Sequence, residues 1–596
     1  MTGYTPPLAE IAFVLRHVAD LDRVAALPGL QDATPDLVDA LLAEAGRLAA
    51  RRLVPLNPVG DRQPPVLTDG RVRMPPGFRE GYRAFAAGGW PGLAVPRSHG
   101  GQELPRLVAT AVTELWAAAN LALHNCALLT EGAAAAILRH GTEAQRRLYA
   151  EPLIAGRWTG AMCLTEPQAG SDVGALRTRA FRDGDHHRIV GTKVFITFGA
   201  HDLAENIVHL VLARIDGAPA GTTGLSLFIV PMSLPGPDGR PGRRNDVRCV
   251  SLERKLGLHA SPTCVIAYGD DGGAEGFLLG EPDQGMRCMF TMMNHARLAV
   301  GHQGLGLAER AWQQAAAYAH GRVQGRRHGR PVPIEAHPDV RRVLLTMRAK
   351  IAAMRALCYW TAAWCDRAER EPDPVSRRLA SARVDLLTPI VKAWCADQAF
   401  EIAADAILVH GGAGYVEETG AAQHLRDARA LAIYEGTNGI QALDLVGRKL
   451  DREGGAALRP MLGELAAGLD GALPGLVPPL RDAVAAVERA TSHLLAASAD
   501  DRAAAATAYL RLFATTLGGL LLARGAAVAV PGAAGADWPG LARLYAAAVL
   551  PPAVALERQV RAGAALLDLP AVGPAGRGGP DPSAQLSARS VPSRGR

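Results

Sequence analysis

One carboxylate stands apart in the run IYEGTNGIQ, residues 433–441. An acid on a solvated helix face normally has charged neighbours three or four positions away. Glu435 instead has Leu431 and Gly439 four residues to either side, and it is the only charged residue in the run. These neighbours do not suit a surface acid, and they make Glu435 the first candidate for chemistry.

Two further stretches combine residue types that could hold a ligand. CLTEPQAGSDVG, residues 163–174, brings the hydroxyls of Thr165 and Ser171 together with glycines that permit close backbone approach. FITFG, residues 195–199, offers an aromatic ring and then a hydroxyl on a strand, which could lie along a flat ring system. A polar turn and a half-buried strand are the alternative interpretations.

Three more segments carry candidate binding residues. MMNHARLAVGHQGLG (292–306) places Arg297 at a helix start, and GRVQGRRHG (321–329) is basic and broken by glycines. HGGAGYVEETG (410–420) could form a backbone nest for an anion. No glycine fingerprint of a Rossmann turn and no P-loop is present, so a nucleotide must bind by another scheme.

Elements of two kinds must position these residues. Apolar residues recur at helical spacing before residue 160, and TEAQ (142–145) after Gly141 resembles a capping box that starts a new helix. Short Val-, Ile- and Phe-rich runs separated by DGD, PDG and DDGG then predict antiparallel strands. We expect a helical domain at 1–160, a β domain at 161–283, a second helical domain at 284–450, further helices at 451–569 and a disordered tail at 570–596. Asp500 or Asp501 should cap one of the added helices.

Charge and cysteine usage narrow the function classes. The formal charge is +6, of which four Arg (577, 589, 594 and 596) against Asp581 supply half in the tail, so a nucleic-acid surface is disfavoured. Eight cysteines show no zinc-like spacing, which predicts reduced buried thiols and no metal. The apolar stretch 512–530 is interrupted by Arg524 and a Gly-Gly pair, and the N-terminus lacks a secretory pattern. We expect no membrane span and a cytoplasmic location.

Taken in this order, the motifs resemble the acyl-CoA dehydrogenase family over residues 80–450. LTEPQAGSDVGALRTRA and IYEGTNGIQ at this separation, on either side of a β domain, carry the resemblance. LNPVGDRQPP, HDLAENIVHLVLAR and the added helices resemble a long subgroup of that family, up to about residue 569. The implied fold is α+β: an N-terminal helical domain, a central antiparallel β-barrel or sandwich, a C-terminal helical bundle and an extra helical region.

The resemblance implies FAD-dependent α,β-dehydrogenation of an acyl-CoA thioester, with Glu435 as the base that removes the α-proton while hydride passes to flavin N5. Burial would strengthen this base, and Gly436 would leave room for the thioester. The cofactor-binding residues implied by the motifs are Met162, Leu164, Thr165, Gly170, Ser171, Phe195, Ile196, Thr197, Arg322, Gln324, Gly411, Gly412, Gly414, Thr437 and Asn438.

The substrate-binding residues implied by the family are Ser171, Asn294, Arg297 and Gly436. Relatives often have Trp where Phe195 stands and an acid where Asn294 stands. Arg322, Gln324 and residues 411–414 match positions that reach the FAD of a neighbouring subunit, so a homo-oligomer is expected, with a dimer favoured. An electron-transfer flavoprotein is the expected electron acceptor.

Several alternatives stay open at this point. The subgroup permits 3-methylmercaptopropionyl-CoA or a fatty acyl-CoA as substrate, and a carrier-protein thioester would present the same reacting atoms. Oxidases and monooxygenases share the fold, but they replace or lose the glutamate that Glu435 matches. A non-catalytic helical assembly protein is disfavoured by the intact motif residues.

Overall fold

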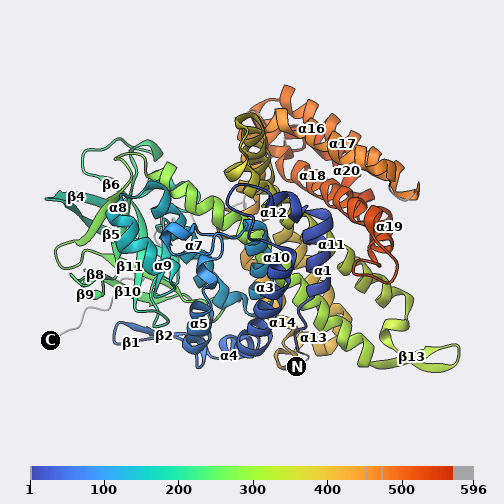
Figure 1. Cartoon of the computed structure of the whole chain (residues 1–596), viewed down its shortest axis with the longest axis horizontal. Coiled ribbons are helices and arrows are strands. Elements are labelled where there is room, and N and C mark those ends of the chain that lie inside the picture. Colours follow the sequence, from blue (N-terminus) through green and yellow to red (C-terminus); the bar gives the residue numbers. More distant parts are fainter. Residues whose placement is uncertain (1–2, 451–452, 472–473, 568–596) are drawn as a thin grey trace, which may run out of the picture.

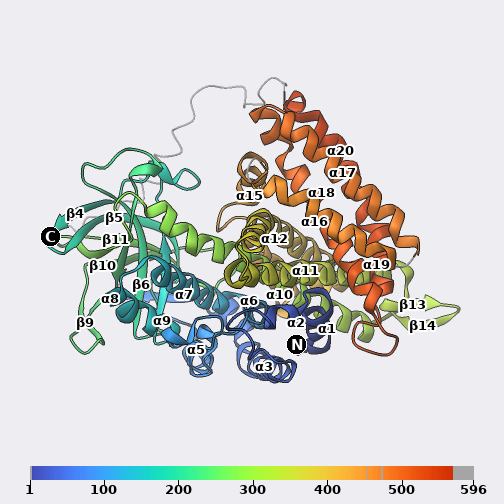
Figure 2. The same ribbon diagram turned by 45° about the horizontal axis from the view of Figure 1, so that its top comes forward.

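The computed structural model describes residues 3–450, 453–471 and 474–567. Figures 1 and 2 show a β domain at one end, long helices across the middle and a further group of helices beside them. The predicted tail and its arginines lie outside the described residues. One hydrophobic core runs through the N-terminal, central and added helices, and two smaller clusters lie in and beside the β domain.

The N-terminal region is helical with one small hairpin. The predicted capping box is confirmed, because the Thr142 hydroxyl accepts from the Gln145 amide (3.2 Å) and the Gln145 side chain accepts from the Thr142 amide (3.0 Å). The hairpin β1–β2 was not anticipated. The elements are α1 (Leu8–Phe13), α2 (Leu21–Ala25), α3 (Pro35–Leu48), α4 (Leu56–Arg62), β1 (Val66–Thr68), β2 (Arg71–Arg73), α5 (Phe78–Ala87), α6 (Arg106–Ala119), α7 (Leu121–His140), α8 (Glu143–Gln145) and α9 (Glu151–Ile154).

The β domain is built around one long strand, β5, which pairs β11 along one half and β4 and β12 along the other. Most pairs are antiparallel, as predicted, whereas β3 and β4 run parallel to β6. The strands are β3 (Trp158–Cys163), β4 (Arg179–Asp183), β5 (His186–Thr197), β6 (Asn206–Ile215), β7 (Ser226–Pro231), β8 (Ser233–Pro235), β9 (Pro241–Arg244), β10 (Val247–Leu252), β11 (Thr263–Tyr268) and β12 (Ala274–Leu279).

Long helices form the central bundle. The helices α10 and α12 approach so closely that a Cβ on Gly304 would lie 2.7 Å from the Cys395 carbonyl oxygen, so this position accepts only glycine. The elements are α10 (Gly285–Gly321), β13 (Val323–Arg327), β14 (Arg330–Pro333), α11 (Pro338–Arg370), α12 (Pro374–His410), α13 (Gly412–Tyr415), α14 (Ala421–Leu431) and α15 (Asn438–Asp444).

The added helices pack on this bundle through α18, which contacts α11, α12 and α15. A Cβ on Gly518 of α18 would lie 3.2 Å from the Trp394 ring of α12. The predicted cap of α18 is wrong by two to three residues: Ser498 is the cap, and its hydroxyl accepts from the Asp501 amide at 3.2 Å. The helices are α16 (Glu453–Ala467), α17 (Val477–Ala496), α18 (Ala499–Val528), α19 (Trp538–Ala548) and α20 (Leu550–Ala562).

Within the part of the chain that the structure describes, three helical segments are long and apolar enough to cross a membrane by length and composition alone. In Leu121–His140 and Ala499–Val528, 83% of the most apolar window is buried inside the protein, so these segments serve its core. In Trp538–Ala565 the value is 33%. This last segment combines α19 and α20, which meet next to Pro551 and Pro552.

Candidate active site

Glu435 lies in the short loop between α14 and α15. Its backbone is left-handed (φ +58°), a conformation that costs a non-glycine residue energy, and Gly436 follows at φ +84°. Its Oε2 atom is buried and has no hydrogen-bond partner among the described groups. Burial raises the pKa of Glu435 to about 7, although the nearby charges of Lys392 and Arg297 lower it. A carboxylate poised near neutral pH is suited to accept a proton.

Helix α12 holds one side of this loop. The side-chain amide of Asn438 donates to the Ala393 carbonyl (3.1 Å) and to Asp397 Oδ1 (2.7 Å), and its oxygen accepts from Lys392 Nζ (2.9 Å). The Asn438 amide N–H also donates to the Ala432 carbonyl at 3.0 Å and so closes the loop. Burial lowers the pKa of Lys392 to about 7, against the opposing charges of Glu435 and Asp397.

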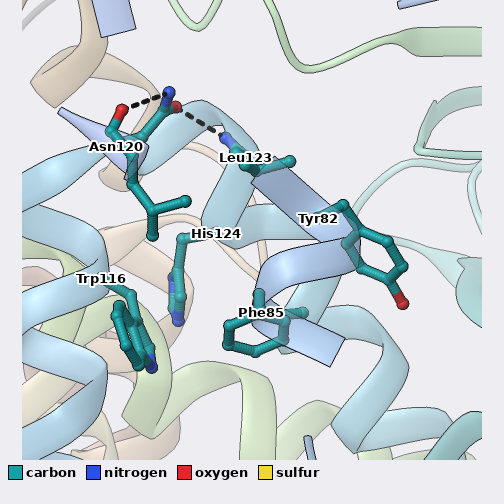
Figure 3. Close-up of a pocket in the computed structure, with 8 residues that line it drawn as sticks. Tyr82, Phe85, Trp116, Asn120, Leu123 and His124 are labelled. Atoms are coloured by element: carbon teal, nitrogen blue, oxygen red, sulfur yellow. Dashed lines mark hydrogen bonds between the residues drawn. The ribbon is translucent and has the colours of Figure 1, made fainter. Parts of the chain in front are cut away.

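Helices α10 and α7 hold the other side. The Tyr434 hydroxyl donates to Gln303 Oε1 (2.6 Å), and Gln303 Nε2 lies 3.0 Å from His124 Nδ1 and donates to Asn125 at 2.7 Å. Figure 3 shows His124 beside Trp116 and Phe85, at a cavity of about 20 Å³. Burial lowers the pKa of His124 to about 4, so the imidazole stays neutral and its Nδ1 accepts from Gln303.

Arg297 is the second of two buried cationic side chains beside the base, after Lys392. It lies on α10, its Nη1 is 3.7 Å from Asp444 Oδ2, and burial lowers its pKa. A Cβ on Gly436 would lie 2.8 Å from Gln441 Nε2, so glycine avoids a close contact with that side chain and leaves Arg297 at an ordinary contact distance of 3.9 Å. Asn294, by contrast, lines a separate cavity of about 510 Å³ whose lining includes neither Arg297 nor Glu435.

A buried ion pair fixes the segment that carries Thr165. Glu166 Oε1 lies 2.9 Å from Lys193 Nζ and 3.0 Å from the Thr178 amide, and the Lys193 side chain is fully buried. The Val194 amide donates to the Thr165 carbonyl at 2.9 Å, so this turn lies against β5, next to Phe195. Met162 and Leu164 are half-buried here, whereas Gly170 and Ser171 are exposed at the end of the turn.

The end of β5 presents an aromatic surface. Phe195 is 60% exposed and left-handed (φ +58°), which leaves its ring free for a planar partner. Ile196 is buried, and Thr197 pairs with Thr263 of β11. The turn before Thr263 packs on α14, where the Leu258 amide donates to Asp427 at 2.5 Å. Helix α14 then leads directly to the Glu435 loop.

The remaining predicted flavin residues lie at the far end of α10. Tyr318 of α10 stacks on His410 at 4.5 Å between ring centroids, so Arg322 and the loop after His410 share one end of the bundle. Helix α10 spans 37 residues, about 55 Å, and its first residue donates to the Leu225 carbonyl beside β7. Figure 1 shows β13 at the end of the bundle opposite the β domain. Arg322, Gln324, Gly411, Gly412 and Gly414 thus do not join the Phe195 surface of their own chain.

Four family models match consecutive parts of the chain. They are the acyl-CoA dehydrogenase N-terminal domain (residues 61–157), middle domain (161–270) and C-terminal domain (283–450), and an acetyl-CoA dehydrogenase C-terminal-like domain (459–570). The chain belongs to the acyl-CoA dehydrogenase family. The resemblance inferred from the motifs is therefore confirmed.

Individual relatives extend this comparison. The chain is 45% identical over 510 residues to a 3-methylmercaptopropionyl-CoA dehydrogenase of Ruegeria pomeroyi, with 84% of this chain and 86% of the relative covered. Its fold is similar to that of an acyl-CoA dehydrogenase complexed with FAD from Bacillus anthracis (TM-score 0.73, 19% identity, 92% and 90% covered). A butyryl-CoA dehydrogenase structure from Megasphaera elsdenii matches at TM-score 0.58 and 26% identity; it covers 70% of this chain and 98% of its own.

Enzymes of this family are FAD-dependent oxidoreductases, and residues of this chain fit that cofactor. The exposed Phe195 ring suits a flat ring system, and open glycines lie at residues 411 and 412, where an added Cβ would meet nothing within 4 Å. Two of the predicted flavin contacts already have partners within the chain. The Thr437 hydroxyl caps α15 by accepting from the Ile440 amide (3.2 Å), which leaves its own hydrogen available to a flavin. The Asn438 side chain is held by α12.

Lys392, Gln303 and His124 were missed from the sequence. The available signal for Lys392 was a lone cation in the apolar run LLTPIVKAWCA, residues 386–396. Its partner, Asn438, lies 46 residues further along the chain. No local spacing rule connects the two.

Proposed function

We propose that the chain oxidises an acyl-CoA thioester to the trans-2-enoyl-CoA, with Glu435 as the base that removes the α-proton. The observation that carries the proposal is the isolated Glu435 carboxylate, which has a buried, unpartnered oxygen and a pKa raised to about 7 by burial. With a pKa of about 7, the base is deprotonated in about half of the molecules at neutral pH, and its free oxygen is available to the substrate.

The residues of the chain divide the remaining work. Phe195, Ile196 and Thr197, with Thr165 and Ser171, would hold the flavin; FAD, when bound, supplies the two-electron acceptor for the hydride from the β-carbon. Among the backbone hydrogen bonds of the described residues, none is donated by the Glu435 N–H, which is thus free to bind the thioester oxygen as negative charge develops there. A hydrogen bond of this kind is worth about 3 kcal/mol in a dry site.

The identity of the acyl group is a more specific part of the proposal. The similarity to the Ruegeria enzyme favours 3-methylmercaptopropionyl-CoA, and a fatty acyl-CoA is the second candidate. A carrier-protein thioester would engage the same base. An oxidase or monooxygenase reaction is disfavoured, because the glutamate of the YEGT motif is present as Glu435.

Glu435→Gln tests the role of the base. We expect the variant to keep FAD and to lose at least about a thousandfold in turnover, since the nearly isosteric amide cannot accept the proton. Bleaching of the flavin absorbance by a panel of acyl-CoAs and acyl carrier proteins identifies the substrate of the wild-type enzyme. Substantial turnover by Glu435→Gln would move the base elsewhere, with Glu417 and Glu418 the next acids to test.

A homodimer completes the proposal. Exposed apolar residues flank the predicted cross-subunit segments, namely Val323 (53% exposed), Leu408 (74%) and Tyr415 (85%), which suits a contact with a second copy. The second copy would bring its Arg322 and Gln324 to the FAD of the first. We further propose that an electron-transfer flavoprotein accepts the electrons and that the protein is cytoplasmic. The eight cysteines, which form no disulfide, support this location.

A further inference from the structure

The hydrogen bonds that hold the Glu435 loop continue into the added helices. Asp397 accepts from Asn438 through Oδ1 (2.7 Å), and its second oxygen, Oδ2, lies 3.4 Å from the Arg511 guanidinium of α18. Asn438 is the third residue after Glu435. The path from the base to the added helices therefore runs through one side chain of α15 and one of α12.

Packing places α18 where it can act on this loop. Helix α18 contacts α15, which begins at Asn438, as well as the face of α12 that carries Trp394. Gln441 of α15 contacts the loop directly. Its side-chain nitrogen lies 3.4 Å from the Glu435 carbonyl oxygen and 3.5 Å from the Gly436 carbonyl oxygen. A displacement of α15 would therefore move the backbone that aims the Glu435 carboxylate.

Lys392 shares the same anchor. Its side chain is fully buried, and its ammonium group donates to Asn438 Oδ1 at 2.9 Å. If Asn438 turned away, Lys392 would lose this acceptor and Asp397 would lose a donor, so both ionisable groups would become less well solvated. The three side chains thus favour one position of the loop.

A shorter structure of the family matches only part of this chain. The Megasphaera structure is matched over 98% of its own length but over only 70% of this chain, while the fourth family model covers residues 459–570 here. Helix α18 lies within that added region.

We propose that the added helices position the catalytic loop, with Arg511 acting through Asp397 and Asn438 on Glu435. Arg511, Asp397 and Asn438 are positioning residues, since none of them touches the reacting atoms. The inference rests on the proposed role of Glu435 as the base. It gives the region after residue 450 a function in turnover in addition to its packing.

Arg511→Gln in the full-length, FAD-loaded enzyme is the direct test. The Arg511 side chain is 48% exposed, so the pair contributes modestly, and we expect kcat to fall two- to fivefold with KM and FAD content unchanged. Arg511→Lys retains the cation and should restore kcat. Asp397→Asn, which weakens both contacts, should lower kcat at least tenfold, and adding Arg511→Gln to it should cause little further loss, because both changes break one path.

A matched control separates positioning from a general loosening of the domain. Glu464→Gln removes an ion pair between α16 and Arg383 of α12, and the Glu464 side chain is 52% exposed, close to the value for Arg511. We expect it to leave kcat unchanged. An unchanged kcat in Arg511→Gln, or an equal loss in Glu464→Gln, would overturn the proposal. Glu435→Gln is assayed in parallel: if it stays active, the proposed base is wrong, whereas an inactive Glu435→Gln beside an unaffected Arg511→Gln rejects only the positioning role.

Discussion

Replacing the base should make the protein more stable at alkaline pH and leave its stability unchanged in acid. Burial raises the pKa of Glu435 from an ordinary 4.5 to about 7. Below pH 4.5 the carboxyl group is protonated in the folded and the unfolded chain alike. Between pH 4.5 and 7 the unfolded chain loses this proton while the folded chain keeps it, so the wild-type protein loses stability as the pH rises. Above pH 7 both states are ionised and the full deficit remains.

The size of the effect follows from these two values. Each pKa unit is worth about 1.4 kcal/mol, so ionised Glu435 costs the fold about 3 kcal/mol. Glu435→Gln removes that cost. For a chain of 596 residues with an unfolding entropy of about 2.1 cal/mol/K per residue, the gain corresponds to a rise in Tm of about 2 to 3 °C.

Thermal unfolding of the FAD-saturated proteins at pH 8 and pH 5 measures this difference. At pH 8 the neighbouring Lys392, whose pKa is also about 7, is mostly neutral, so the loss of its attraction to Glu435 contributes little. Glu418→Gln is the control, because Glu418 is exposed and the same chemical change there should leave Tm unaltered. An equal Tm for Glu435→Gln and wild type at pH 8, or a gain of the same size at pH 5, would refute the reasoning.

Further outcomes follow from the same geometry. The wild-type kcat/KM should rise with pH through about 7. Lys392→Met should move that rise to higher pH, because it removes the first of the two nearby charges that lower the pKa of Glu435. An unchanged pH dependence of kcat/KM in this variant would show that Lys392 does not act on the base. Arg322→Ala should lower FAD content and Tm together, as measured by flavin absorbance and thermal unfolding, while a stable monomer with full flavin would contradict a shared site. Light scattering should give the mass of two chains, because α16–α20 cover part of α11 and α12 and so mask a second interface. Truncation after Leu450 should then produce tetramers or aggregates. A mass of four chains for the intact protein would reject the masking.

Local patterns predicted the fold well where short-range rules decide it. Helical periodicity and turn residues located the β region between two helical ones, and the capping box at Thr142 formed as expected. The parallel pairing of β3 and β4 with β6 was missed, because strand order depends on contacts between distant segments. The cap of α18 was missed because Ser498 and Asp501 are both good capping residues, and only the path of the chain selects between them.

In the candidate site, too, some residues could be predicted from local sequence, and others depend on long-range packing. Glu435 was recognisable from its uncharged neighbours, and the structure shows the burial that this pattern suggested. Asn438 was expected at the flavin, yet its side chain binds Lys392 and Asp397, whose positions depend on how α12 packs. Gln303 contacts Tyr434 from 131 residues away, and no spacing in the sequence links them.

The length of α10 has a genetic consequence. Because about 55 Å of helix separates the β-domain end of α10 from Arg322, each site of the proposed dimer would combine the base of one chain with the arginine of the other. Consider a heterodimer of a Glu435→Gln chain and an Arg322→Ala chain. Both defects fall in one of its two sites, and the other site contains only intact residues. Two defective alleles expressed together would then complement each other within a single protein, whereas mixed chains with self-contained sites would keep a defect in every site.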